Sequence, residues 1–148
     1  MTIWFDMDGT LAALFFVKGF SEMLAKGDMT PYEVAKPLYN EDEMKEVITT
    51  LKNKGYNIGV ISYADAENLT NATKTKMEWL EKYFPYATEI HITTKDIAKS
   101  TYYKAGDILV DDAKANRLDW ESKGGRTINA YFRAKVSMMD SLKELIKE

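Results

Sequence analysis

Residues 3–10 read Ile3-Trp4-Phe5-Asp6-Met7-Asp8-Gly9-Thr10. The apolar start of this stretch predicts a β-strand that ends where the two aspartates begin. The glycine after them allows the chain to turn sharply. Two carboxylates this close repel each other unless a cation or a shared proton lies between them, and Mg²⁺ prefers oxygen ligands. An ordinary acidic turn uses the same residue types, so the rest of the chain must supply partners for a site.

The composition is that of one globular domain and excludes several kinds of site. The chain has 148 residues, 45% of them hydrophobic, and we expect a single domain over residues 1–148. The net charge of −3, without basic blocks, gives no footprint for duplex DNA or RNA but does not exclude a small nucleotide. Cysteine is absent and His91 is the single histidine, which excludes disulfides, thiolate sites and multi-histidine zinc sites. The longest apolar run, residues 11–17, is too short to span a bilayer, so we expect no membrane association and a cytoplasmic protein.

Short strands alternate with helices along most of the chain. Strands are predicted over residues 2–5, 57–61, 89–92, 107–110 and 126–130. Helices are predicted over residues 41–54, 68–84, 113–123 and from 138 onward. In the second of these helices, Met77, Leu80 and Phe84 are expected to form the apolar stripe. The alternation predicts an α/β fold class, with a three-layer, Rossmann-like arrangement around a mostly parallel sheet.

The segment of residues 12–40 departs from this alternation. Glycines and prolines divide it into short pieces, and Thr30-Pro31-Tyr32-Glu33 has the pattern of a helix start. We expect one or two short helices that form a small, reduced cap, or lid, over the crevice of the sheet. The Phe15-Phe16 pair is expected to pack in the core or the lid rather than to form a platform for stacked bases.

Polar side chains gather at the predicted carboxyl ends of three strands. They are Asp6 and Asp8, Ser62, and Asp111 and Asp112, with Lys99 in the connection before the last of these strands. Because the ligand crevice of a parallel sheet lies beyond the carboxyl ends of its strands, we expect these residues to converge. Carboxylates can hold a cation, and a lysine and a hydroxyl suit the oxygens of a phosphoryl group. The set therefore predicts metal-assisted phosphoryl transfer through an aspartate nucleophile.

Each member of this set also has an ordinary explanation. A serine such as Ser62 at a strand end often belongs to a turn, and Asp111 and Asp112 are suited to cap the helix that follows them. Lys99 has a rival in Lys95, which lies in the same connection. The joint occurrence of all these residues at strand ends favours the site over the separate explanations.

The motifs resemble those of the haloacid dehalogenase superfamily of phosphatases. Residues 6–10 are similar to its first motif, and residues 58–62, an apolar strand ending in serine, to its second. Lys99 fits the third motif, and residues 107–112, an apolar strand ending in acids, fit the fourth. All four occur in the order of the family.

Within the superfamily, the last motif most resembles the 5′-deoxyribonucleotidase branch and its uncharacterised bacterial and phage relatives. The likeness rests on Asp111-Asp112 followed by Asn116, Trp120 and Gly124-Gly125. The chain departs from many first motifs, which carry a further aspartate where this chain has Ala12-Ala13. This departure would change contacts to the cap or the substrate.

The resemblance implies a magnesium-dependent phosphatase with a haloacid-dehalogenase-like fold. Asp6 would attack phosphorus to form an aspartyl-phosphate, and Asp8 would act as the general acid and then the general base. Ser62 and Lys99 would bind the phosphate.

The same resemblance implies a set of magnesium ligands. They would be the Asp6 side chain, the Asp8 backbone carbonyl and Asp112, with Asp111 on a water of the metal or behind the direct ligands. The expected partner is a small-molecule phosphate monoester, with a nucleotide as one candidate. Two alternatives stay open: a phosphatase for another substrate, such as a sugar phosphate or a nucleic-acid end, and a catalytically silent phospho- or metal-binding module.

Overall fold

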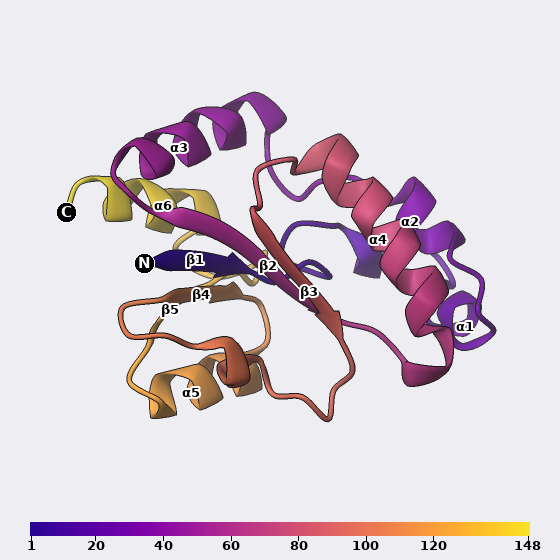
Figure 1. Ribbon diagram of the computed structural model, residues 1–148. Helices are drawn as coiled ribbons and strands as arrows, with labels where there is room; N and C mark the ends of the chain where they lie inside the picture. The colour runs from indigo at the N-terminus through magenta and orange to yellow at the C-terminus, as the bar shows by residue number, and fades with distance from the viewer.

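The computed structural model describes all residues, 1–148, and contains one five-stranded parallel sheet with the strand order β3-β2-β1-β4-β5 (Figure 1). The strands are β1 (Thr2–Phe5), β2 (Asn57–Tyr63), β3 (Glu89–Thr93), β4 (Ile108–Asp111) and β5 (Arg126–Asn129). Each of them overlaps a strand predicted from the sequence. The predicted α/β, Rossmann-like fold with a parallel sheet is therefore confirmed.

The helices are α1 (Phe20–Ala25), α2 (Thr30–Val34), α3 (Glu41–Asn53), α4 (Leu69–Tyr83), α5 (Lys114–Ser122) and α6 (Met138–Ile146). Three short 3₁₀ turns, η1 (Leu14–Phe16), η2 (Ala66–Asn68) and η3 (Lys99–Tyr102), lie in the connections. The Asn40 side chain accepts a hydrogen bond from the Glu43 N–H and so caps α3, and Ser137 caps α6 in the same way. None of the helices combines the length and the apolar character that crossing a membrane requires.

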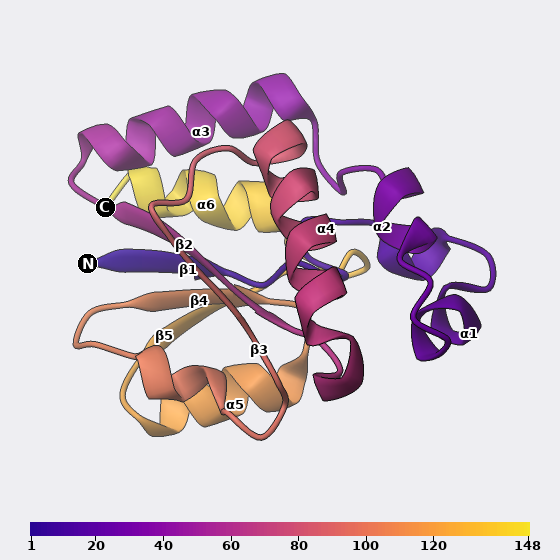
Figure 2. The same cartoon turned by 45° about the vertical axis from the view of Figure 1, so that its right-hand side comes forward.

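Helices cover both faces of the sheet because side chains alternate along each strand (Figure 2). From β1, Ile3 and Phe5 enter a core of 24 buried residues that also includes side chains of α3, α4 and α6. Trp4 points to the opposite face, where it joins a smaller cluster with Trp120 of α5. The fold thus has three layers: helices α3, α4 and α6 on one face, the sheet in the middle, and helix α5 on the other face.

The buried face of α4 differs from the expected stripe. Met77 is 41% exposed, and the buried side chains of the helix are Ala72, Lys76, Trp79 and Leu80. The prediction for Met77 was wrong because Lys76, the residue before it, occupies the inner face instead. A buried ammonium is tolerated only where acceptors surround it, and such contacts are not visible in a local pattern.

The strand register brings the predicted site residues to one edge. Phe5 of β1 is level with Val110 of β4, so Asp6 and Asp111 end neighbouring strands side by side. The Asp6 N–H continues the ladder by donating to the Val110 carbonyl at 2.9 Å. The two acidic strand ends are therefore held together by the backbone itself.

The segment between β1 and α3 lies beyond this edge of the sheet, where α1 and α2 are found on the same side as the end of α4 (Figures 1 and 2). The short helices expected there are present. Helix α2 rests on α4, where the Trp79 indole N–H donates to the Ala35 carbonyl at 3.0 Å. That the segment acts as a lid stays a prediction.

Candidate active site

A cavity of about 340 Å³ lies where β1 and β4 end. Its acidic side consists of the four aspartates at these strand ends, Asp6, Asp8, Asp111 and Asp112. Its apolar side comes from the segment between β1 and α3: Leu14, Phe15, Phe20, Leu24, Met29 and Tyr32. The remaining wall is formed by Tyr63, Ala64, Asp65, Asn68, Ala72, Lys95, Ala113 and Asn116. The volume falls within the range of small-molecule sites.

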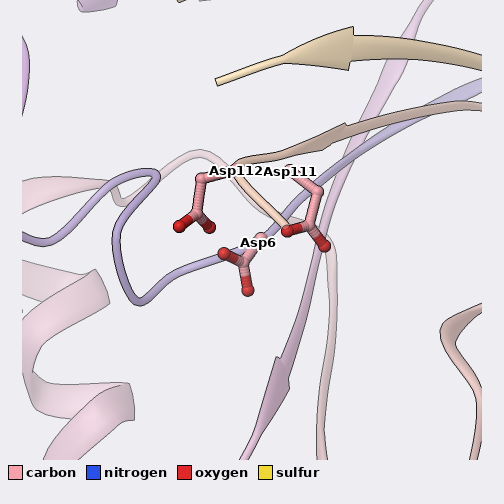
Figure 3. Close-up of side chains that lie close together, drawn as sticks. All are labelled: Asp6, Asp111 and Asp112. Atoms are coloured by element: carbon pink, nitrogen blue, oxygen red, sulfur yellow. The ribbon is translucent and has the colours of Figure 1, made fainter. Parts of the chain in front are cut away.

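Three of the aspartates, Asp6, Asp111 and Asp112, form a compact cluster (Figure 3). One carboxylate oxygen from each lies within 4.8 Å of those of the other two. Figure 3 shows that they come from the chain after β1 and from the end of β4. The structure thus brings together three of the four aspartates that the sequence assigned to a metal site.

The Lys99 ammonium lies between two of the clustered carboxylates. Its Nζ is 2.7 Å from Asp6 Oδ1 and 2.8 Å from Asp111 Oδ2, and the side chain is 2% exposed. Burial opposes the charged form, but the two carboxylates outweigh it and keep the pKa of Lys99 above its ordinary value. When all four groups are ionised, three carboxylates and one ammonium leave an excess of two negative charges.

The pKa values of the crowded aspartates shift in different directions. Burial acts to raise the pKa of Asp6, but Lys99 and hydrogen bonds from its neighbours outweigh it, and this pKa lies below its ordinary value. Burial and the adjacent Asp6 raise the pKa of Asp112 to about 8. A cation among the three carboxylates would counter this shift by favouring their ionised forms. The donor set and its excess negative charge therefore fit a hard divalent cation such as Mg²⁺.

Asp111 is the most heavily bonded of the three. Its Oδ1 accepts the Ala113 N–H at 2.9 Å, and its Oδ2 accepts from Lys99 and, at 3.1 Å, from the Asn116 amide. Burial and the nearby Asp6 raise the pKa of Asp111 in spite of Lys99. Because both of its oxygens are occupied, Asp111 suits a supporting place behind Asp6 and Asp112.

Two residues of the first motif fix the turn that carries the cluster. Gly9 has φ of +81°, and a Cβ there would come 2.5 Å from Asp112 Oδ2, so a larger residue cannot be accommodated without displacing that carboxylate. Thr10 Oγ1 lies 3.0 Å from Asp6 Oδ2 and 3.1 Å from Asp112 Oδ1, and it accepts the Asp112 N–H. The single proton of this hydroxyl serves one carboxylate at a time. Thr10 was not singled out in the sequence as a site residue.

Asp8 lines the same cavity but has different partners. Its Oδ2 accepts a hydrogen bond from the Tyr32 hydroxyl at 2.9 Å and lies 3.3 Å from Lys76 Nζ. Its Oδ1 is buried without a hydrogen-bond partner. Burial raises the pKa of Asp8 above its ordinary value, and Lys76 offsets this only in part. Asp8 therefore holds a proton more readily than Asp6, two residues away.

Lys76 of α4 is a second buried ammonium, which the sequence analysis missed. It is 0% exposed, and its Nζ donates to Ser62 Oγ at 2.7 Å and to the Tyr63 carbonyl. Ser62 is itself 1% exposed, and Lys76 links it to Asp8 by bonding to both side chains. Because Ser62 accepts from Lys76, its own proton remains available for another acceptor. The hydroxyl is not part of the cavity wall, so its role in phosphate binding stays a prediction.

The two candidate lysines of the third motif occupy different places. Lys99 is buried against Asp6, whereas Lys95 is exposed and lines the cavity. Lys99 makes ion pairs with Asp6 and Asp111, whereas Lys95 makes none and is free to meet a ligand.

Fold and site together define an α/β protein with a lysine-supported acidic cluster at the carboxyl edge of its sheet. Comparisons with protein-family models and with curated proteins find no match. Among solved structures, the chain is similar to the D,D-heptose 1,7-bisphosphate phosphatase from Burkholderia thailandensis. The TM-score is 0.55 at 10% sequence identity, and the likeness covers 99% of this chain and 99% of that one.

At this identity the likeness shows the fold alone. The shared fold agrees with the expected haloacid-dehalogenase-like architecture. It gives no support to the 5′-deoxyribonucleotidase branch in particular.

Proposed function

We propose that the protein is a magnesium-dependent phosphatase that hydrolyses a phosphate monoester through an aspartyl-phosphate on Asp6. The observation that carries the proposal is geometric: two carboxyl groups, two residues apart, line one cavity with different partners, Asp6 against Lys99 and Asp8 against Tyr32 and Lys76. The directions of the pKa shifts agree with this difference, since the pKa of Asp6 lies below its ordinary value and that of Asp8 above. A nucleophilic carboxylate must be ionised, and a general acid must carry a proton. Two neighbouring carboxyl groups with environments of opposite effect suit these two roles.

The proposed reaction has two steps on the same phosphorus. In the first, an Asp6 oxygen bonds to phosphorus while the ester bond breaks and the Asp8 proton passes to the departing oxygen. In the second, the Asp8 carboxylate takes a proton from water, whose oxygen bonds to phosphorus as the bond to Asp6 breaks. Inorganic phosphate leaves, and Asp6 and Asp8 return to their starting states.

The metal would be held by Asp6 and Asp112, with the Asp8 backbone carbonyl as a further ligand and Asp111 behind them. Bound there, Mg²⁺ would neutralise the charge that keeps an anionic phosphate away from the Asp6 carboxylate. Two unit charges 4 Å apart repel by about 4 kcal/mol at an effective dielectric constant near 20. Lys99 compensates part of this charge and holds Asp6 Oδ1 in a fixed orientation.

The cavity wall supports a small phosphate monoester with an apolar or aromatic leaving group. Ten of the 18 residues that line it are hydrophobic. Lys95 is the only one of the 18 with a cationic side chain. A single cation in the wall suits one phosphate better than two. A nucleoside 5′-monophosphate is the specific candidate, since a base can rest on the apolar side formed by residues 14–32.

Removal of divalent metal ions is expected to abolish hydrolysis. Treatment with EDTA should stop the release of nitrophenolate from p-nitrophenyl phosphate, and added Mg²⁺ should restore it, because the acidic cluster otherwise retains its excess negative charge. Calorimetric titration with Mg²⁺ gives a second readout. If Mg²⁺ binds without any turnover of a panel of phosphate esters, the chain is instead a silent metal-binding module.

The substitution Asp8→Asn is expected to lower kcat on alkyl phosphates by about 10²- to 10⁴-fold, because an amide supplies no proton to the leaving oxygen. Aryl phosphates, whose leaving groups need less protonation, should lose less in the first step. The comparison of p-nitrophenyl phosphate with glycerol phosphate measures the difference. Tyr32→Phe is the matched control, since it removes one hydrogen bond to Asp8 and leaves the carboxyl group. Equal losses on both esters would count against Asp8 as the acid.

A further inference from the structure

Four aromatic side chains form an exposed row beside the cavity, which we name the aromatic ledge: Phe15, Phe16, Tyr131 and Phe132. They are 51%, 61%, 43% and 49% exposed, respectively. The ring centroids of Phe16 and Phe132 are 5.1 Å apart, as are those of Tyr131 and Phe132. Neither Phe15 nor Phe16 lies in the core, because half or more of each side chain faces solvent, although Phe15 packs on Phe20 of the segment expected to form the lid.

Two segments distant in sequence build the ledge at the same end of the sheet. Phe15 and Phe16 belong to η1, after β1, and Tyr131 and Phe132 to the loop between β5 and α6. Figure 2 shows this loop, in yellow, at the end of the sheet where the chain leaves β1. The ledge thus joins two segments that are far apart in the sequence.

The ledge begins at the acidic cluster. Phe15 lines the cavity, and a Cβ built on Gly9 would meet both its Cε2, at 2.4 Å, and the Asp112 carboxylate, at 2.5 Å. At the other segment, the Ala130 N–H donates to the Asp111 carbonyl at 3.1 Å. The ledge thus runs from Phe15, which lines the cavity, to its neighbour Phe16 and to Phe132, whose ring packs on that of Phe16.

The charged residues of the two segments are all basic. Residues 11–18 and 130–137 contain Lys18, Arg133 and Lys135 and no Asp or Glu, although the whole chain carries a net charge of −3. All three side chains are exposed, and the Arg133 guanidinium lies 5.1 Å from the centre of the Phe132 ring. Exposed aromatic rings with cations beside them suit the bases and the backbone of a single-stranded nucleic acid.

We propose that the aromatic ledge binds the terminal bases of a single-stranded nucleic acid whose end phosphate enters the cavity. The proposal rests on the phosphatase function above and extends its candidate substrate from a free nucleotide to the phosphorylated end of a nucleic acid. A second copy of this chain is the competing occupant. The nucleic acid is favoured because the rings continue the cavity and because their cations complement phosphates rather than another basic surface.

The test compares the wild type with the double variant Phe16→Ala/Phe132→Ala. Neither ring lines the cavity, so hydrolysis of p-nitrophenyl phosphate with Mg²⁺ is expected to stay within twofold of wild type. On single-stranded ten-nucleotide DNA with a 5′- or 3′-phosphate, kcat/KM is expected to fall roughly tenfold to hundredfold, the loss of one or two base stacks. Leu118→Ala on α5, which truncates a side chain of 56% exposure, is the matched control and should change neither rate.

A binding measurement tests whether the aromatic ledge binds nucleic acid without requiring turnover. Fluorescence anisotropy with a labelled ten-nucleotide strand should show binding that weakens with salt and is lost in the double variant. Equal binding or equal kcat/KM on the oligonucleotides in both proteins would overturn the proposal, while hydrolysis of p-nitrophenyl phosphate would leave the phosphatase function standing. Light scattering that shows a wild-type dimer and a monomeric variant, with oligonucleotide binding unchanged, would assign the ledge to self-association. Absence of hydrolysis of every ester would overturn the phosphatase function and the proposed substrate with it.

Discussion

The substitution Asp6→Asn is expected to reduce phosphatase turnover by about 10⁴-fold or more, because an amide oxygen does not attack phosphorus. The fold should survive. Asparagine has the shape of aspartate and can still accept a hydrogen bond from Lys99. The substitution also removes one negative charge from a crowded cluster. We expect the free energy of unfolding to stay within about 1 kcal/mol of wild type. Steady-state rates on p-nitrophenyl phosphate with Mg²⁺, together with thermal unfolding, measure both effects.

Asp65→Asn is the matched control for this variant. Asp65 lines the same cavity but lies outside the cluster of three aspartates, so its rate should remain close to wild type. An Asp6→Asn rate within tenfold of wild type would reject Asp6 as the nucleophile. A phosphorylated intermediate trapped by acid quench and mapped to Asp6 would supply the positive counterpart.

The second large effect is expected for Lys99→Met, which removes the ammonium between two buried carboxylates. Loss of one partner of a buried ion pair typically costs about 3 to 5 kcal/mol, and here Asp6 and Asp111 both lose their counter-charge. Activity should be lost as well, since Asp6 is no longer held and its pKa is no longer lowered. Urea unfolding of the two proteins at pH 7 measures the difference in stability.

The pH dependence of this variant has a defined sign. Without Lys99, burial raises the pKa of Asp6 above that of the unfolded chain, so the folded state binds the additional proton. The stability lost at neutral pH should therefore be partly regained as the pH falls through that raised pKa. A deficit that grows on acidification would contradict the assigned ion pair.

Lys95→Met separates the two lysines of the third motif. Lys95 is exposed on the cavity wall and makes no ion pair, so its removal should leave stability within about 0.5 kcal/mol of wild type. If this variant lost activity while a folded Lys99→Met protein kept it, the two lysines would have to exchange their proposed roles.

Local sequence patterns were sufficient for the sheet and the helix starts. The short apolar strands can be recognised from consecutive residues. The helix starts capped by Asn40 and Ser137 can be recognised in the same way. The convergence of Asp6 and Asp111 followed from the geometry of parallel strands, since both residues stand at the end of a strand in one register. These features need no knowledge of distant contacts.

The rest of the site depends on contacts between distant segments. Lys76 was overlooked because a lysine on the inner face of a helix is stable only when Asp8 and Ser62 accept its protons. The hydrogen bond from Tyr32 to Asp8 joins the segment between β1 and α3 to the first motif across a gap of 24 positions. The exposure of Phe16 likewise depends on where the loop after β5 lies. A charged residue at a core position of a helix remains the one signal that could have pointed to Lys76.

A crystal soaked with Mg²⁺ and fluoroberyllate, which imitates a phosphoryl group on a carboxylate, tests the central claim most directly. We predict beryllium bonded to the Asp6 carboxylate and one magnesium ion that contacts both Asp6 and Asp112. Fluoroberyllate on another residue, or a magnesium ion that Asp6 and Asp112 do not share, would contradict the proposed phosphatase.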